Sequence, residues 1–366
     1  MRIALIVPGG VDRSGTHRVT PCLLWLVERL ARRHDLQVFA LFQEAAASRY
    51  SLLGATVHTV GRRWAKINAV KAVRAEHRAK PFDVIHAWGT PAGVAAAILG
   101  KMLSRPVLWH LAGGELVSLP TIRYGGRLTA RGRLWSWIAL RGAARITAAS
   151  PSIVREAAAF GFRAERLILG VDLERWSVKE PRRRAPRAPV RLLQVASINR
   201  VKDQGTLLQA MVHLQEACVD YHLYIVGEDT LDGEMERRAK SLSVIDRVTF
   251  RGFVPHGQLH DMMAQADLLV VSSLHEGGEV VTLEAAVCGV PVVGTRVGHV
   301  EALAPDAAVA VPVGDALALA EAIATVLEDE DRRLQLAREA QRRATAHDAE
   351  ATAGRVEEIY EEMIRS

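Results

Sequence analysis

The chain has 366 residues and a mass of 40.0 kDa; 49% of its residues are hydrophobic and 24% are charged. This length is too great for one ordinary hydrophobic core, so length and composition together predict a soluble protein of two globular domains. No apolar stretch reaches the ~18 residues that a membrane span needs, which argues against a membrane-spanning protein.

The first ten residues, MRIALIVPGG, contain one arginine and a short apolar run before turn residues. This pattern predicts a buried first strand rather than a signal peptide, and therefore a cytoplasmic location. Cys22, Cys218 and Cys288 are odd in number, far apart and without metal-ligand spacing. They indicate packing residues rather than a disulfide framework or a zinc site.

Positive charge is concentrated in the first half of the chain. Residues 1–177 hold 26 Lys/Arg and 11 Asp/Glu, a net charge of +15, whereas residues 191–366 have a net charge of −13. Between them, VKEPRRRAPRAPV (residues 178–190) has three prolines, a net charge of +4 and no hydrophobic periodicity, which is typical of a linker. The basic half favours an anionic partner.

Apolar runs alternate with amphipathic stretches through residues 1–177, the expected N-terminal domain. Its predicted strands are IALIV, LQVFAL, DVIHAW, PVLWHLAG and ARITAAS, and helices are predicted at 19–33 and 68–79. Strand, helix, strand with apolar strand runs indicates a parallel sheet covered on both faces. This half is therefore expected to be a Rossmann-like α/β domain.

The same rhythm returns in residues 191–348, the expected C-terminal domain. Strands are predicted at VRLLQVAS, HLYIVG, VTF, DLLVVSS and VPVVGT, and helices near Asp203, Asp232, Gly257 and Thr282. Residues 316–364 are expected to be helical throughout, with the helix of 349–366 packing back on the first domain. Two doubly wound domains bind ligands at the C-terminal ends of their strands, in the cleft between them.

Glycine-rich and basic loops follow two of these strands. PGGVDRSGTHR contains Gly9, Gly10 and Gly15 after the first strand, but its spacing matches neither the dinucleotide fingerprint nor the P-loop. INRVKDQGT places Arg200 and Lys202 before a helix, where two cations and the helix dipole favour a diphosphate. An ordinary basic surface loop is the alternative for this second segment.

A histidine and a second glycine pair are expected at another strand end. His110 follows PVLW and precedes Gly113, Gly114 and Glu115. A lone histidine is more often structural than catalytic, but a position at a strand end favours the ligand cleft. His86, in contrast, is expected to be structural.

HEGGEVVTLEAAVCGVPVVG, residues 275–294, contains two glutamates eight positions apart. Glu284 lies among apolar residues on a short helix that is predicted to be mostly buried, and a buried charge is costly unless it is hydrogen-bonded. Glu276 precedes Gly277 and Gly278, which suit a loop where the backbone approaches another group. The pair indicates a site; the alternative is a surface acid with a second acid favoured by the helix dipole.

These segments together resemble a known family. Residues 272–295, S-x-x-H-E-G-G-x-V-x-x-L-E-A-A-x-x-G-x-P-V-V-G-T, are similar to the E-x7-E signature of the retaining glycosyltransferases of family 4. LLQVASINRVKDQGTLLQA resembles the family's donor-diphosphate loop, and LGVDLERW and RITAASPSIVREA resemble the end of its first domain. The resemblance implies the GT-B fold, with the nucleotide-sugar donor on the second domain and the acceptor on the first.

The resemblance also implies roles for single residues. Glu284 would bind the donor ribose, Glu276 and His110 the transferred sugar, and Arg200 and Lys202 the diphosphate. Further donor contacts are implied for Gly15, Gly277, Gly278, Glu279 and Val280, and acceptor contacts for Gly113, Gly114 and Glu115. No metal and no cofactor are expected, since the arginine and lysine take the place of a cation; the donor would be a UDP-, GDP- or ADP-sugar.

The chain departs from the family pattern at two places, after the first motif glutamate and before the final helix. Gly278 and Glu279 stand where relatives often have a larger residue and then a small one, and Asp348 stands near the aromatic residue that commonly begins the final helix. The added carboxylate of Glu279 would repel the diphosphate or read a different pattern of sugar hydroxyls. The mechanism implied is transfer with retention at the anomeric carbon, with the leaving phosphate itself taking the acceptor proton.

The basic residues of the first half give an indication of the acceptor's location. Residues 121–145 mix six arginines with Tyr124, Trp135 and Trp137, and a helix from about Thr129 would present them to an anionic membrane. A packed helix with a solvated arginine face is the equal alternative. We expect a lipid-linked or surface glycan as acceptor and a peripheral position at the inner membrane face.

Three other functions remain open from the sequence. A sugar-nucleotide epimerase shares this architecture, and a catalytically silent sugar-nucleotide-binding protein would keep Glu284, Arg200 and Lys202. A nucleic-acid-binding protein is permitted by the charge, but no recognition motif or stacking array is present. The presence of Glu276 and His110 favours the enzyme, and nucleic acid is not an expected partner.

Overall fold

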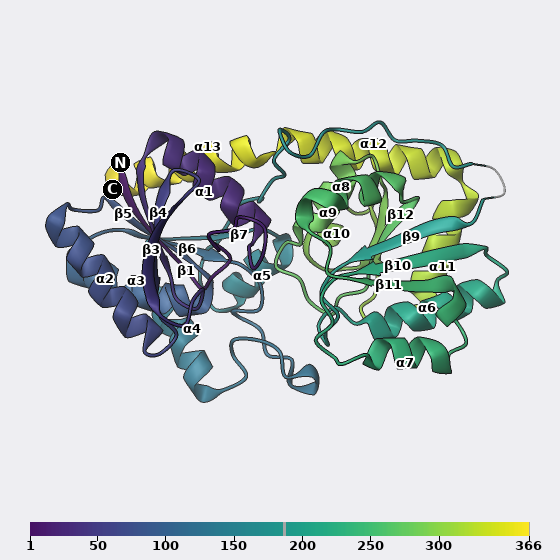
Figure 1. Cartoon of the computed structure of the whole chain (residues 1–366), viewed down its shortest axis with the longest axis horizontal. Helices are drawn as coiled ribbons and strands as arrows, with labels where there is room; N and C mark the ends of the chain where they lie inside the picture. Colours follow the sequence, from purple (N-terminus) through teal and green to yellow (C-terminus); the bar gives the residue numbers. More distant parts are fainter. Residues whose placement is uncertain (186–187, 366) are drawn as a thin grey trace. The chain divides into compact units, whose positions relative to one another are not determined.

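The chain forms two α/β units in a computed structural model that describes residues 1–185 and 188–365 (Figure 1). Unit 1 contains residues 1–170 and the C-terminal segment from Ala349, and unit 2 contains Val171–Asp348. The predicted linker, 178–190, includes residues 186 and 187, which lie outside the described residues.

Unit 1 is built on an eight-stranded sheet with the order β3-β4-β2-β1-β5-β6-β7-β8. Its strands are β1 (Arg2–Val7), β2 (Asp35–Ala40), β3 (Ala47–Leu52), β4 (Ala55–Val60), β5 (Val84–Trp88), β6 (Val107–Leu111), β7 (Arg145–Ala148) and β8 (Glu165–Arg166). All neighbouring strands are parallel except β3 and β4, which are antiparallel. The predicted parallel sheet is confirmed, because every predicted strand of this half is present.

The helices of unit 1 are α1 (Pro21–Arg33), α2 (Ala65–Ala79), α3 (Gly89–Leu103), α4 (Ala130–Gly142), α5 (Pro151–Ala159) and α13 (Ala349–Arg365), with a short 3-10 turn at Pro120–Ile122. Helix α4 starts as predicted, since the Thr129 side chain accepts a hydrogen bond from the Gly132 N–H at 3.0 Å. Helix α13 packs on α1. Its Tyr360 is fully buried, with the hydroxyl 2.6 Å from Nδ1 of His86, so His86 has the structural contact that the sequence predicts.

The β3–β4 hairpin was not predicted. Its outer strand, ASRYSL, is exposed at every second residue, and Gly54 turns the chain at a φ of +84°. An edge strand of this kind contributes little apolar sequence, so hydrophobic periodicity does not detect it.

Unit 2 has a six-stranded parallel sheet with the order β11-β10-β9-β12-β13-β14. Its strands are β9 (Val190–Val195), β10 (Tyr221–Val226), β11 (Val248–Gly252), β12 (Leu268–Val271), β13 (Val292–Thr295) and β14 (Val309–Val311). The chain crosses between non-neighbouring strands, as in a doubly wound fold. The predicted class, α/β with two Rossmann-like units, is therefore confirmed.

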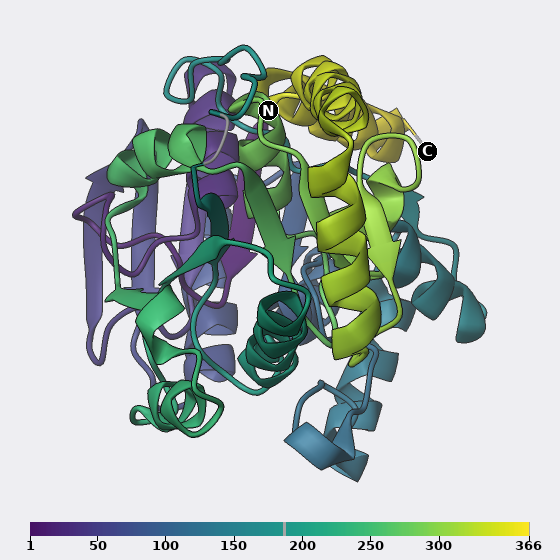
Figure 2. The ribbon, with the colours of Figure 1, turned by 90° about the vertical axis from the view of Figure 1, so that its right-hand side faces the viewer.

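The helices of unit 2 are α6 (Gln204–Glu216), α7 (Glu234–Ser241), α8 (His256–Gln265), α9 (Val280–Val287), α10 (Gly298–Leu303), α11 (Ala316–Glu328) and α12 (Glu330–Ala346), with a 3-10 turn at Ile245–Arg247. Helices α6 and α11 lie side by side (Figure 2) and, with β9 and β10, enclose the apolar core of the unit.

The sequence predicts that residues 316–364 are helical throughout, and the structure differs from this prediction. The segment is divided into α11, α12 and α13, and the first break is at Asp329, whose side chain accepts a hydrogen bond from the Arg332 N–H at 2.8 Å. A side-chain acceptor at this position caps a new helix. Asp329 therefore marks the junction between α11 and α12.

Candidate functional site

Lys202 and Glu276 form an ion pair at the C-terminal edge of the sheet of unit 2. Nζ of Lys202 lies 2.5 Å from Oε1 of Glu276, and the Ser273 hydroxyl donates to the same oxygen at 2.6 Å. The side chains of Lys202 and Glu276 are 23% and 11% exposed. Both residues, with Ser273 and Glu279, line a small cavity of about 20 Å³. The structure thus brings together a cation and an acid that the sequence assigned to one site.

The loop after β9 fixes the position of Lys202. The Asn199 side-chain oxygen accepts hydrogen bonds from the N–H groups of Val201 and Lys202, both at 3.1 Å. Asp203 then caps α6 by accepting from the Thr206 N–H at 3.2 Å. These local hydrogen bonds, together with the buried side chain of Ile198, hold the loop in place. The Lys202 ammonium therefore stands beside the start of a helix, where an anion is favoured.

Arg200 takes a different direction from Lys202. Its guanidinium makes two hydrogen bonds to the carboxylate of Glu234 on α7, at 2.8 and 2.6 Å, and its side chain is 55% exposed. No described contact joins Arg200 to Glu276 or to Lys202. The predicted pair of cations is thus present in one loop, but only Lys202 points toward Glu276.

The glycine pair and the start of α9 form a backbone turn next to Glu276. Gly278 has a φ of +152°, a conformation that other residues rarely adopt, and Gly277 is buried. Helix α9 begins at Val280, and its cap residue, Glu279, makes no side-chain hydrogen bond to the helix N-terminus. The backbone N–H groups of this turn suit an anionic ligand.

Glu284 is buried in the middle of α9, as predicted, and is only 4% exposed. Its Oε1 lies 2.6 Å from Nε2 of His256 at the start of α8. The His256 ring in turn packs on Trp176, with the ring centroids 5.0 Å apart. A buried carboxylate with a hydrogen-bonding partner on one oxygen retains acceptor capacity for ligand hydroxyls.

The Glu279 carboxylate is turned toward the start of α10. It accepts hydrogen bonds from the N–H groups of His299 at 3.0 Å and Val300 at 3.2 Å, and from the Thr282 hydroxyl at 2.9 Å. Gly298, with a φ of +49°, leaves room for it because a side chain there would overlap the carboxylate. Burial, and secondly the charge of Glu276, raise the pKa of Glu279 to about 7. The added acid thus acts as a helix cap in this structure.

We expect Glu279 to make the stability of unit 2 depend on pH. The folded pKa of about 7 lies above the ordinary 4.5, so the folded state binds more protons between these values. The free energy of unfolding therefore falls by roughly 3 kcal/mol as the pH rises from 4.5 to 7. Urea unfolding at several pH values would show this slope in the wild type and its loss in Glu279→Gln. Equal slopes in both proteins would contradict it.

His110 is the residue before the last one of β6, close to the strand end at which the sequence predicts it. Its ring is fully buried, Nδ1 lies 3.0 Å from the Thr147 hydroxyl, and the ring packs on Trp88 at 4.5 Å. Nε2 has no hydrogen-bond partner among the described residues. Burial lowers the pKa of His110 to about 3, so the ring is neutral at physiological pH. The sequence placed this side chain too close to the surface.

Glu115 is 9% exposed and accepts hydrogen bonds from the N–H groups of Ala112 at 3.2 Å and Gly113 at 2.7 Å. Burial raises its pKa. Gly114 packs against the Tyr124 ring so closely that a side chain would overlap it. These predicted acceptor residues therefore form one tight turn after β6, in which the carboxylate satisfies backbone groups.

Gly15 lies in the loop between β1 and α1. It has a φ of +67° and donates its N–H to the Asp12 carbonyl at 3.0 Å, which closes a turn. No atom lies within 4 Å of a side chain placed there. The loop therefore leaves space in front of Gly15 at the C-terminal end of β1.

Sequence reasoning missed His256, Ser273 and Asn199 as parts of the site. His256 precedes Glu284 by 28 residues, and no periodicity links the two. Ser273 falls at an unspecified position of the motif, next to Ser272, and its hydroxyl contact with Glu276 depends on where β12 ends. Among the described residues, no group of three or more His, Cys, Asp or Glu side chains could hold a metal ion.

Two family descriptions match consecutive parts of the chain. "Glycosyl transferases group 1" matches residues 179–343, and "Glycosyl transferase 4-like domain" matches residues 19–170. Together they cover the candidate site residues of both units except Gly15, which precedes the first match.

Similar curated proteins include glycosyltransferases of different specificity. D-inositol 3-phosphate glycosyltransferase of Xylanimonas cellulosilytica is 28% identical over 295 residues, which are 72% of this chain and 69% of that protein. N-acetyl-alpha-D-glucosaminyl L-malate synthase of Bacillus anthracis is 30% identical over 142 residues, 38% of this chain. That alignment spans 36% of the relative's length, and the alignment with 2-deoxystreptamine N-acetyl-D-glucosaminyltransferase of Streptomyces fradiae spans 26%.

Solved structures share the fold over the whole chain. Anabaena HepE, solved with UDP-glucose, has a TM-score of 0.76 at 20% identity and covers 99% of this chain and 100% of its own. Sucrose-phosphate synthase from Thermosynechococcus elongatus has a TM-score of 0.82 at 18% identity, with 100% of both chains covered. At these identities the likeness establishes the fold alone. The two family matches together show that the chain belongs to the group 1, family 4-like glycosyltransferases, and the structural likeness gives it the GT-B fold of two Rossmann-like units.

Proposed function

We propose that this protein transfers a sugar from a nucleotide-diphosphate sugar to an acceptor hydroxyl, with retention at the anomeric carbon and without a metal. The observation that carries the proposal is the paired arrangement in unit 2, where Glu276 contacts Lys202 and Glu284 contacts His256. Family membership and a neighbour of the same fold solved with UDP-glucose support a nucleotide-sugar donor.

Lys202 is assigned to the diphosphate. Its ammonium is partly buried, held by a capped loop, and stands near the turn of Gly277, Gly278 and Val280. Fixed positive charge and backbone N–H groups stabilise the charge that develops on a departing diphosphate. Glu276, the present partner of Lys202, would turn to the sugar hydroxyls as the diphosphate takes its place. Arg200 would assist once its exposed contact with Glu234 is exchanged for phosphate.

Glu284 is assigned to the ribose hydroxyls. His256 binds one of its oxygens and Trp176 supports His256, so the carboxylate is fixed before the ligand arrives. A preorganised acceptor loses little entropy when it binds a diol. Glu279 would contribute to the donor site mainly through the turn that its carboxylate stabilises.

The first unit is assigned to the transferred sugar and the acceptor. Nε2 of His110, which has no partner among the described residues, would be the ring atom left for a sugar hydroxyl. Gly15 offers space for a phosphate or sugar, and the Gly113–Glu115 turn would border the acceptor. Since no carboxylate is assigned as nucleophile, the leaving phosphate oxygen would take the acceptor proton.

The test of this reaction is the stereochemistry of the product. Incubation with α-linked UDP-, GDP- and ADP-hexoses and simple alcohol acceptors, followed by NMR of the anomeric proton, should give an α-linked product from one donor. A β-linked product would refute retention. A changed sugar with no transfer would identify an epimerase, and tight binding without turnover would identify a sugar-nucleotide-binding protein.

We further propose that the acceptor is presented at an anionic membrane surface, as a lipid-linked or surface glycan. Among the described residues, no helix is long and apolar enough to span a bilayer. Helices α2 and α4 nevertheless expose Trp64, Ile67, Leu134 and Trp137, which are 50–67% exposed. Exposed aromatic and basic residues together favour the headgroup region.

The basic side chains of this surface are close to its aromatic ones. Lys66 of α2 lies 2.7 Å from the centre of the Trp135 ring, and Arg131 lies over the same ring at 4.2 Å. Burial, and secondly Arg131, lower the pKa of Lys66 to about 8, so it remains largely charged at pH 7. Arg141 packs on Trp137 at 4.9 Å. This mixture supports binding to anionic headgroups.

We expect vesicles with anionic lipid to bind the protein, and Trp137→Ser to weaken that binding by about tenfold. Flotation with and without phosphatidylglycerol measures it. Phe253→Ser is the matched control, because Phe253 is 54% exposed but lies in unit 2. Equal flotation without anionic lipid, or an equal loss in both variants, would contradict the proposal and favour a soluble acceptor.

A further inference from the structure

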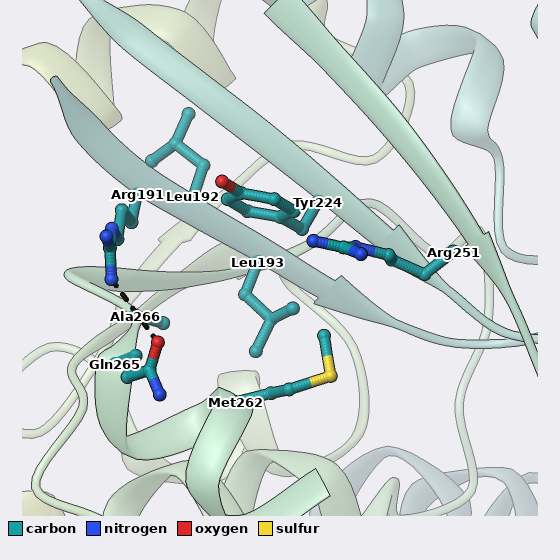
Figure 3. A pocket seen from close by; sticks show the side chains of 8 residues that line it. All are labelled: Arg191, Leu192, Leu193, Tyr224, Arg251, Met262, Gln265 and Ala266. Atoms are coloured by element: carbon teal, nitrogen blue, oxygen red, sulfur yellow. Dashed lines mark hydrogen bonds between the residues drawn. The ribbon is translucent and has the colours of Figure 1, made fainter. Parts of the chain in front are cut away.

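Unit 2 contains a pocket that shares no lining residue with the cavity of Lys202 and Glu276. It has a volume of about 270 Å³ and lies between β9, β10, β11 and the end of α8 (Figure 3). Its main lining residues are Arg191, Leu193, Tyr224, Arg251, Met262 and Gln265.

The strand pattern explains why a pocket forms here. Leu193 of β9 is paired with Tyr224 of β10, and side chains two residues apart on one strand share a face of the sheet. On the opposite face, β10 buries Leu223 and Ile225 in the core. On the pocket face, Tyr224 and the α8 residue Met262 line the hollow, and both are only partly buried.

The pocket carries two positive charges that no acid neutralises. Among the described residues, neither Arg191 nor Arg251 is within ion-pair distance of a carboxylate. Arg191 contacts the Gln265 side-chain oxygen at 3.4 Å, and Arg251 lies over the Tyr224 ring at 5.5 Å. By contrast, Arg182 nearby is paired with Asp267 at 3.1 Å. Two guanidinium groups facing one hollow favour an anion of more than one charge.

Apolar atoms line the space between the two arginines. Figure 3 shows Arg191 and Arg251 on opposite sides of the pocket, with Leu193 and Met262 between them and the Tyr224 ring beside Arg251. A free inorganic anion would leave this apolar surface in contact with water. A ligand that joins a dianion to a flat or apolar ring would cover it.

We propose that this pocket binds a small phosphate monoester carrying one ring. The guanidinium groups of Arg191 and Arg251 bind the phosphate, and the ring lies on Leu193 and Met262. A volume of about 270 Å³ is at the small end of ligand pockets, which limits the ligand to about one ring and its phosphate. The site is separate from the donor site, and its occupancy does not depend on the reaction proposed above.

Phenyl phosphate is a suitable probe because it has the ring and the dianion but no ribose for Glu284. In calorimetry with the full chain, we expect it to bind about tenfold more tightly than inorganic phosphate or phenol. Arg191→Gln and Arg251→Gln should each weaken binding by about tenfold. Arg237→Gln is the control, since Arg237 is exposed on α7, where its side chain donates a hydrogen bond to the Asp232 carbonyl, and it does not line the pocket; the variant should bind as the wild type does.

Three results would overturn the proposal: no saturable binding of phenyl phosphate, binding that both pocket variants retain, or binding that Lys202→Ala abolishes while Arg251→Gln keeps it. Circular dichroism would confirm that each variant is folded. Uridine monophosphate and glucose 6-phosphate, titrated into the double variant Lys202→Ala/Glu284→Gln, show whether the natural ligand of the pocket is a nucleotide or a sugar phosphate. Tighter binding of the first indicates a nucleotide, and tighter binding of the second indicates a sugar phosphate.

Discussion

Lys202→Ala should lower kcat by about 10²- to 10³-fold, the usual loss when one preorganised group that stabilises a developing charge is removed. The reason is the position of Lys202, whose ammonium is held 2.5 Å from Glu276 beside the start of α6. Deletion would also leave Glu276 with only the Ser273 hydroxyl as a described partner. Steady-state kinetics with the donor that the NMR assay identifies would measure the effect.

Lys240→Ala is the matched control for this prediction. Lys240 also pairs with a glutamate, Glu236 at 2.8 Å, but its side chain is 59% exposed on α7. Its loss should leave kcat unchanged, because an exposed pair of this kind contributes little. An unchanged kcat for Lys202→Ala, in a variant that still binds the donor, would remove Lys202 from the reaction.

Glu284→Gln should raise the dissociation constant for the nucleotide by about 10- to 100-fold while folding is retained. A carboxylate that accepts hydrogen bonds from two hydroxyls contributes about 1.5–3 kcal/mol for each bond to the charged group. The glutamine keeps the shape and one acceptor oxygen, so the change removes charge rather than packing. Calorimetry with the nucleoside diphosphate alone separates this effect from contacts with the sugar.

Two further variants serve as comparisons for the nucleotide affinity of Glu284→Gln. His256→Asn should give a smaller loss of affinity, since it removes the 2.6 Å contact that orients Glu284 but keeps the carboxylate. Glu236→Gln, an exposed position on α7, should have no effect. If Glu284→Gln binds the nucleotide as tightly as Glu236→Gln does, the ribose assignment is wrong.

Several strands of the two units could be predicted from sequence because they are short, mainly apolar runs that are buried along their whole length. β1, β5 and β12 are examples in which every residue is buried. Such runs must be covered on both faces, which specifies a parallel α/β sheet. The β3–β4 hairpin was missed because its outer strand is polar and half exposed.

The sequence predicts which segments carry the site, but it does not predict which side chains contact each other there. The E-x7-E spacing placed Glu284 on a buried helix, yet its partner His256 comes from another helix 28 residues earlier. Arg200 and Lys202 are two residues apart and point to different acids. Side-chain direction in a loop depends on caps such as Asn199 and Asp203, and sequence spacing does not report it.

Glu279 and His110 are buried groups whose side-chain direction likewise could not be predicted from the sequence. The sequence marked Glu279 as a charge that could face the diphosphate, but its carboxylate caps α10 instead. His110 lies next to the last residue of β6, near the strand end where the sequence predicts it, but its ring is fully buried. Successive side chains of a strand point to opposite faces of the sheet, so a position near the strand end does not tell whether the side chain is covered.

The central claim is that unit 2 holds a nucleotide-sugar donor without a metal. Calorimetric titration of the full chain with UDP-, GDP- and ADP-glucose in the presence of EDTA tests it most directly. We predict one-site binding of one nucleotide series, with a thermal shift that corresponds to about 2.7 kcal/mol at a ligand concentration of 100 times the dissociation constant. Absence of binding by all three series, or binding that appears only when a divalent cation is added, would contradict the account.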